Sequence, residues 1–462
     1  MVRLFAVAGY IYQSATAIIL IFAISHLLAA VDYTHFSLAL ASSQLLCVLA
    51  FEWLQLAGLR FLAAADERDG ARLRWSLFTA GLLSACALVV IGACASVMSP
   101  LASGIVALGL VVAVLQGLTD LYFLTIRLSD RLGLASLLLA LRATALVGGA
   151  VTGAVLSGTA EAALLGIAAG HVTGLAAGLI AYRTRLSPAP ASAVLSDWSE
   201  FCRYGMLAAG ASVIHLSVPV LLRFIIIGRL GATGAGAGFS VALDLLQRPF
   251  WVLNAAIHTI SYPEVVHDFE HGGTRRSVDS ARRMFEFMIC TTIVLLGGLI
   301  GFIPDAAHIL LPQESVDGFL ATAPAIALFY FLHTHLQATA AIVPHLEKLA
   351  TRLVVVAAGQ LAIVSVSSAL AVAAGLSPRS AVICAAATTA IAILLALGPT
   401  VRYHAGPRAV LVVQSVAAAF LIACLASVPI QPAWLAGKIL IAALATAAVA
   451  WRGDFLMLAR RG

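Results

Sequence analysis

Long apolar runs are the feature of this sequence that most limits its fold. Runs of roughly 20 or more mostly apolar residues recur along the chain, separated by short polar loops. A helix needs roughly 20 residues to cross the ~30 Å hydrocarbon core of a bilayer. Backbone polar groups in lipid must be hydrogen-bonded internally, so crossing segments are helices or barrel strands. The runs are continuous rather than alternating with a period of two, and they therefore predict helices.

The composition supports lipid as the solvent. The chain has 462 residues, of which 62% are hydrophobic and 10% charged, with a mean hydropathy of +1.03. A soluble globular chain is about 25% charged. We therefore predict an all-α, polytopic membrane protein with about fourteen transmembrane helices. The predicted spans are 4–30, 36–64, 75–98, 102–126, 134–157, 161–182, 203–228, 237–262, 284–303, 318–343, 353–375, 380–401, 409–428 and 434–451.

Lys and Arg residues predict the orientation, because cytoplasmic loops are rich in positive charge. With a cytoplasmic N-terminus, Arg229 and Arg379 are the only ones of the 27 Lys and Arg residues in outward loops. The C-terminus is then cytoplasmic too. The formal net charge of +6 is mostly a signal of topology, and we predict no nucleic-acid partner.

The spans divide into two halves and an addition. We predict an N-terminal six-helix bundle at 1–183, a cytoplasmic linker at 184–202, a C-terminal six-helix bundle at 203–403, and two extra helices with a cytoplasmic tail at 404–462. The second predicted helix of each half carries an acid, a Gln and an Arg, in "FEWLQLAGLRF" and "ALDLLQRPFWVL". This similarity favours a parallel repeat of the kind found in transporters.

The stretch "ALDLLQRPFW" places Asp244, Gln247, Arg248 and Pro249 in the middle of a predicted span. Charged groups at this depth usually face protein or water. Asp244 and Arg248 are one turn apart, and so they could neutralise each other within the helix. Alternatively, Arg248 is a substrate-facing cation poised by its acid. Pro249 favours the second interpretation, because the carbonyl it frees is tolerated where the backbone lines a cavity.

Three further cations lie inside predicted spans. Arg142 lies deep in the fifth span, and we expect it to face inward. Arg223 lies in the outer half of the seventh span, where it could also reach the membrane surface, and Pro219 should bend that helix. Pro219 and Pro249 are candidate hinges. Lys438 is near the outer end of the last span, and we expect it to extend to the surface.

The candidate coupling acids are Glu52, Asp120 and Asp244. Desolvation disfavours an ionised carboxylate, so such a group can carry a proton. The alternative for Asp120 is a simple hydrogen bond to a neighbouring helix. His333 and His335 fall on opposite sides of one helix, which predicts polar packing or cavity lining rather than a shared metal.

The sixth span carries glycines at four-residue intervals, a ridge that allows close helix packing. These glycines are Gly166, Gly170, Gly174 and Gly178. Beside this glycine ridge, His171 is expected to be satisfied by a neighbour. The sequence has no P-loop, no HExxH and no sizeable extramembrane domain, so we predict a protein that is not an enzyme, with no cofactor and no metal.

Three stretches resemble the polysaccharide-exporter branch of the MOP flippase superfamily. They are "FEWLQLAGLRFLAA", "GFSVALDLLQRPFWVLNAAIHTISYPEVVHDFEHG" and "FIPDAAHILLPQESVDGFLATAPAIALFYF". The resemblance implies two six-helix bundles around a central cavity, with alternating access. It also implies transport of undecaprenyl-diphosphate-linked oligosaccharide across the bacterial inner membrane, for cell-surface polysaccharide such as lipopolysaccharide or exopolysaccharide. A polysaccharide polymerase and glycosyltransferases would be partners.

Arg142, Arg223 and Arg248 are the candidate phosphate-binding cations, chosen by their chemistry. Glu52, Asp120 and Asp244 offset them charge for charge, so the sequence does not give the net sign of the cavity. The coupling ion would be H⁺ or Na⁺. The alternatives are a cation-coupled multidrug antiporter of the MATE type, in which acids dominate the cavity, a membrane polysaccharide polymerase or ligase, and a partner subunit without transport of its own.

Overall fold

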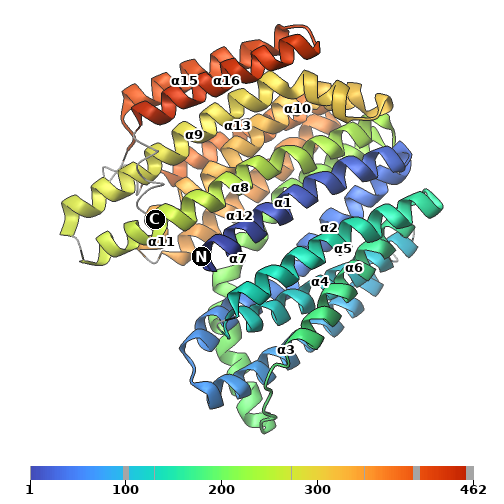
Figure 1. Ribbon diagram of the computed structural model, residues 1–462, viewed down its shortest axis with the longest axis vertical. Helices are drawn as coiled ribbons and strands as arrows, with labels where there is room; N and C mark the ends of the chain where they lie inside the picture. Colours follow the sequence, from blue (N-terminus) through green and yellow to red (C-terminus); the bar gives the residue numbers. More distant parts are fainter. Residues whose placement is uncertain are drawn as a thin grey trace. The chain divides into compact units, whose positions relative to one another are not determined.

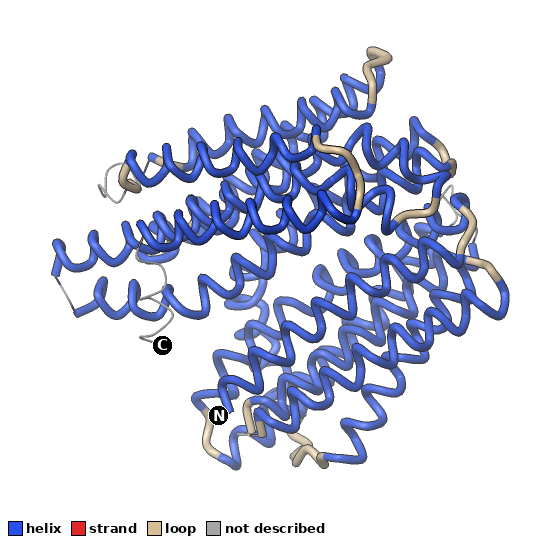
Figure 2. The backbone as a smooth tube through the Cα atoms, turned by 45° about the horizontal axis from the view of Figure 1, so that its top comes forward, coloured by secondary structure: helices blue, strands red, loops and turns tan. Residues whose placement is uncertain are grey.

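The computed structural model describes residues 2–96, 103–129, 131–271, 273–347, 349–398 and 406–453, and Figures 1 and 2 show that these residues are helices joined by short loops. No strand occurs among them. Twelve helices in these ranges are long and apolar enough to cross a membrane. The chain is therefore a polytopic all-α membrane protein, as predicted.

Each predicted span corresponds to an observed helix, but two of these helices fall outside the twelve. In the first helix, α1 (Val2–Leu27), side chains are described only for Tyr12–Leu27, and this part is apolar but shorter than a span. The other is α8 (Gly234–His271), which carries Asp244, Gln247 and Arg248 in its middle. These polar side chains lower the hydropathy of α8, so its place in the bundle depends on neighbouring protein more than on lipid.

The chain forms two compact units, Met1–Val220 and Leu221–Gly462. The boundary lies inside α7 (Ala191–Leu230), one residue after Pro219. The first turns of α7 fall within the segment predicted as the cytoplasmic linker. The predicted bounds of the two bundles and the C-terminal addition are not tested by this division.

Unit 1 consists of six complete helices and the N-terminal part of α7. After α1, these helices are α2 (Ala30–Ala64), α3 (Glu67–Ser96), α4 (Ser103–Arg127), α5 (Leu132–Ser157) and α6 (Ala160–Ala181). The predicted glycine ridge of α6 packs against α5. A Cβ at Gly166 would collide with the backbone of Gly149, and one at Gly170 would lie 2.7 Å from Cα of Leu146. The ridge therefore allows the close approach that the sequence predicted.

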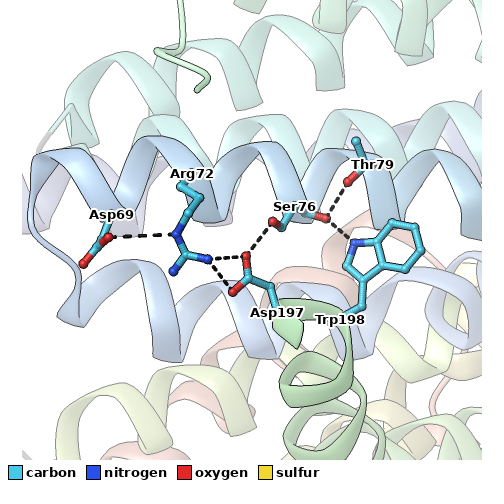
Figure 3. Close-up of polar contacts among 6 residues, drawn as sticks. All are labelled: Asp69, Arg72, Ser76, Thr79, Asp197 and Trp198. Atoms are coloured by element: carbon cyan, nitrogen blue, oxygen red, sulfur yellow. Dashed lines mark hydrogen bonds and ion pairs between the residues drawn. The ribbon is translucent and has the colours of Figure 1, made fainter. Parts of the chain in front are cut away.

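A polar cluster attaches the start of α7 to α3 (Figure 3). Asp197 is buried and accepts hydrogen bonds from Arg72 Nη1, at 2.7 Å to each carboxylate oxygen. It also accepts a 2.6 Å bond from Ser76 Oγ. The indole Nε1 of Trp198 donates to the Ser76 carbonyl at 2.9 Å. Charge-assisted contacts of this kind are stronger than neutral hydrogen bonds, and they hold this part of α7 within unit 1.

Unit 2 contains the rest of α7 and all later helices. After α8, they are α9 (Gly273–Leu310), α10 (Gln313–Thr334), the π-helix η1 (His335–Thr339), α11 (Ile342–Leu346), α12 (Ala350–Ala373), α13 (Pro378–Ala396), α15 (Ala409–Ala423), the 3₁₀ helix η2 (Cys424–Ser427) and α16 (Pro432–Arg452). α15 packs along α9, as Figure 1 shows. Gly297 and Gly301 of α9 make this possible, because a Cβ at either would collide with the α15 backbone.

Two charge pairs hold the C-terminal helices to α9. Glu286 Oε1 accepts from the backbone N and from Nε of Arg408, both at 2.8 Å. Lys438 Nζ donates to both oxygens of Asp305, at 2.8 and 3.0 Å. The prediction that Lys438 extends to the membrane surface is therefore wrong. The predicted ninth span ended at residue 303, whereas α9 continues through Pro304 to Leu310 and brings Asp305 to Lys438.

Candidate functional site

Arg142 of α5 and Asp120 of α4 form an ion pair in unit 1, with Arg142 Nη1 donating to Asp120 Oδ1. Arg142 is only 5% exposed, and its guanidinium lies 5.3 Å from the centre of the Phe123 ring. A Cβ at Gly174 of α6 would lie 2.9 Å from Cγ of Arg142. The glycine ridge therefore also makes room for this arginine, which faces the protein interior as expected.

Glu52 of α2 is the second carboxylate near this pair. It is half-buried and forms no hydrogen bond or ion pair within the described part of the chain. Asp120 is close enough for its charge to act on Glu52. Because Arg142 is engaged by Asp120, Glu52 is the carboxyl group of this cluster without a cation partner among the described residues.

His171 of α6 also lies near Arg142 and Asp120. It is buried, and its Nδ1 has no hydrogen-bond partner among the described residues. The expectation that a neighbour satisfies this ring is therefore wrong for that nitrogen. His171 is therefore a buried polar side chain beside the Arg142–Asp120 pair.

In unit 2, Arg223 of α7 and Asp244 of α8 form the second ion pair. Arg223 Nη2 donates to Asp244 Oδ1 at 2.5 Å, and Arg223 is only 4% exposed. Arg223 thus lies inside the protein, and of the two positions left open for it, the membrane surface is excluded. Asp120 and Asp244 are each only partly buried, at 25% and 23% side-chain exposure.

Arg248 lies one turn after Asp244 but does not pair with it. Arg248 is half-buried and forms no hydrogen bond or ion pair within the described part of the chain. Asp244 and Arg223 are the charged groups close enough to act on it. Of the two interpretations left open by the sequence, the intrahelical ion pair is not formed.

Burial explains why Asp244 prefers Arg223. Leaving one member of a buried ion pair without its partner costs about 3–5 kcal/mol. A solvated pair one turn apart on a helix gains only about 0.3–0.5 kcal/mol. Arg223 is 4% exposed, whereas Arg248 is half-buried. The carboxylate therefore stabilises the molecule most by binding the more buried arginine.

The two candidate hinges lie inside continuous helices. α7 runs through Pro219 to Leu230, and α8 runs through both Pro249 and Pro263. Pro249 has no N–H, so the carbonyl of Leu245 loses its helical partner within one turn of Asp244. Their action as hinges remains a prediction.

Sequence reasoning missed Asp305 and Glu286 as partners of charged groups on other helices. It identified His333 and His335 correctly as polar packing. His333 contacts the Nε2 atoms of Gln337 and Gln360 at 2.7 and 2.8 Å. His335 bonds Thr292 and Thr339 at 2.8 and 2.7 Å. Among the described residues, no group of three or more His, Cys, Asp or Glu side chains has the arrangement of a metal site.

Comparisons with known proteins show which solved structures share this fold. No family model matches the sequence, and no curated protein matches it closely enough to count as a relative. Solved structures do match. Lipid II flippase MurJ in an inward closed conformation aligns with a TM-score of 0.74 at 11% identity, over 98% of this chain and 100% of that chain.

Two other solved structures are similar over most of their length. A MOP superfamily transporter from Pyrococcus furiosus has a TM-score of 0.56 at 13% identity, covering 87% of this chain and 94% of that one. The eukaryotic MATE transporter AtDTX14 has a TM-score of 0.55 at 14% identity, covering 92% and 100%. The predicted resemblance is confirmed at the level of architecture: this chain has the fold shared by MurJ and the MATE transporters of the MOP superfamily.

Proposed function

We propose that this protein is a flippase that moves undecaprenyl-diphosphate-linked oligosaccharide across the bacterial inner membrane by alternating access, for cell-surface polysaccharide biosynthesis. The observation that carries this proposal is Arg248, a guanidinium in the middle of α8 that forms no ion pair within the described part of the chain. The similarity of the fold to that of a lipid II flippase supports it. Both termini would be cytoplasmic. Glycosyltransferases would act before this protein and a polysaccharide polymerase after it.

The chemistry of the substrate explains the need for such a group. A diphosphate and its sugars cannot enter about 30 Å of hydrocarbon unaided, whereas the polyprenyl tail can remain in lipid. A protein then has to supply a polar path and a cation for the phosphates. A guanidinium is suited to this task, since it donates two parallel hydrogen bonds to phosphate oxygens.

Energy coupling would use Glu52. Of the three candidate acids, Asp120 and Asp244 are held by arginines, while Glu52 has no cation partner within the described residues. A partly desolvated carboxylate without a cation binds H⁺ or Na⁺ more readily than one already paired. We therefore assign the coupling ion to Glu52 in unit 1 and the anionic head group to Arg248 in unit 2.

Reconstituted vesicles test the proposal. Labelled undecaprenyl-diphosphate-linked sugar is placed in one leaflet, and its exposure in the other is measured with a membrane-impermeant enzyme. We expect protein-dependent transfer that Arg248→Ala abolishes and Arg248→Lys partly retains. Arg229→Ala is the matched control, because Arg229 is exposed at the end of α7. Absence of protein-dependent transfer by the wild-type protein would rule out the flippase assignment.

The second candidate function is a cation-coupled antiporter of the MATE type. The observation that favours it is the unpaired Glu52, since a cationic drug requires an acid rather than an arginine. An antiporter would move an organic cation against a proton or sodium gradient in the same vesicles. It would lose this activity in Glu52→Gln while keeping it in Arg248→Ala, the reverse of the dependence on Arg248 that we expect for a flippase.

A further inference from the structure

Two arginines compete for one carboxylate in unit 2. Asp244 and Arg248 lie at positions i and i+4 of α8, and an acid that precedes a base at this spacing is placed to pair with it. Arg223 approaches Asp244 from α7 and holds it at 2.5 Å. Only one of the two arginines is therefore neutralised, and it is the one on the other helix.

We propose that Arg223 is a positioning residue whose task is to keep Asp244 away from Arg248, so that Arg248 stays free to bind the phosphates of the substrate. This inference rests on the proposed function and assigns different roles to two arginines that the sequence suggested as equivalent. Arg248 contacts the anion. Arg223 never does, and it acts through Asp244.

The burial of the three side chains supports this division. Arg223 is 4% exposed and already bonded to Asp244, so a phosphate would have to enter a buried place beside a carboxylate to reach it. Arg248 is half-buried and has no such competitor within the described residues. Once the Arg223 charge is removed, Arg248 is the cation placed at i+4 from Asp244 on its own helix. Asp244 would then turn to Arg248 and neutralise it.

A charge-rescue experiment separates the two roles. The dissociation constant for undecaprenyl diphosphate is measured with purified protein in detergent, for wild type, Arg223→Leu, Asp244→Asn and Arg223→Leu/Asp244→Asn. Arg223→Leu should weaken binding about tenfold or more, because a charge-assisted hydrogen bond to the anion is lost. The double variant should bind within about threefold of wild type, because no carboxylate remains to occupy Arg248. Phosphatidylglycerol in place of the diphosphate measures the background of anionic lipid binding.

Rescue is the decisive observation. A purely structural role for Arg223 would not make binding recover when a second charge is removed. If the double variant binds as weakly as Arg223→Leu, Arg223 is itself an anion contact, and the inference is wrong. The inference also fails if Arg223→Leu binds like wild type, because Asp244 then does not pair with Arg248 even when Arg223 is absent.

Failure of the proposed function gives a different result. Arg248→Gln with wild-type affinity would show that Arg248 does not bind the phosphates, whatever Arg223 does. Because Arg223→Leu leaves a carboxylate in a poorly solvated place, that variant can fold badly. The double variant leaves no uncompensated acid at this site, and its comparison with wild type alone decides between positioning and direct contact. Size-exclusion profiles and melting temperatures accompany each measurement.

Discussion

The buried pair between Asp305 and Lys438 gives a quantitative prediction about how the C-terminal helices are held. The side chains are 4% and 1% exposed, and Lys438 Nζ bonds both carboxylate oxygens. Lys438→Met keeps most of the side-chain volume but leaves a buried carboxylate without its donor. We expect a loss of about 3–5 kcal/mol in the free energy of unfolding of unit 2. For a body of this size, that loss lowers the melting temperature by roughly 6–20 °C.

The double variant Lys438→Met/Asp305→Leu should recover most of this loss. Replacing both members of a buried ion pair by apolar side chains of similar volume is often neutral or stabilising. The melting temperature is measured on purified protein in detergent by intrinsic tryptophan fluorescence. Arg282→Met is the matched control, since Arg282 forms a 3.0 Å pair with Asp279 while both side chains are more than 40% exposed. That change should cost less than about 1 kcal/mol.

Two results would refute this reasoning. If the single and double variants melt at the same lowered temperature, packing of the lysine stem rather than its charge stabilises α16 on α9. If Lys438→Met melts like wild type, the carboxylate is solvated or protonated, and the pair does not hold the C-terminal helices in place.

Three further changes test the other parts of the molecule. Glu52→Gln should remove the dependence of transport on a pH or Na⁺ gradient in vesicles without lowering the melting temperature; a retained dependence would exclude Glu52 as the coupling group. Gly174→Ala should destabilise unit 1 by about 1–3 kcal/mol, since the added Cβ would lie 2.9 Å from Arg142 Cγ; an unchanged melting temperature would show that the arginine stem moves freely. Asp197→Asn should cost about 1.5–3 kcal/mol, because Arg72 loses its charged acceptor; trypsin cleavage near the start of α7 should become faster, and equal cleavage rates would count against the attachment of α7 to α3.

The transmembrane helices were predictable from sequence because apolar length is a local property. A run of about 20 apolar residues has one stable form in lipid, whatever its neighbours are. The end of the ninth span was predicted too early, because the end of α9 depends on contacts with residues far away in the sequence. α9 continues past Pro304, where Asp305 is bonded by Lys438 of a helix more than a hundred residues later. Helical periodicity gives no information about such a partner.

The sequence likewise could not identify the ion-pair partners of the charged residues. Periodicity correctly placed Asp244 and Arg248 one turn apart on α8. It could not show that Arg223, on the preceding helix, lies closer to the carboxylate and is more deeply buried. Likewise, the sequence singled out Asp120 and Arg142 on separate spans, but only the packing of α4, α5 and the glycine ridge of α6 brings them into contact. The choice of partner follows from desolvation, which is a property of the assembled helices.

Counting charges along the chain therefore could not show which acid and which arginine lie together. Three acids and three arginines balance in the sequence, yet the structure divides them unevenly between the two units. Unit 1 holds Glu52 and Asp120 with Arg142, whereas unit 2 holds Asp244 with Arg223 and Arg248. Of these six residues, each unit has one Asp–Arg ion pair and one residue outside it, the carboxylate of Glu52 in unit 1 and the guanidinium of Arg248 in unit 2. Since a cation and a phosphate require opposite charges, the proposed function would use the Glu52 carboxylate for the coupling cation and the Arg248 guanidinium for the phosphate.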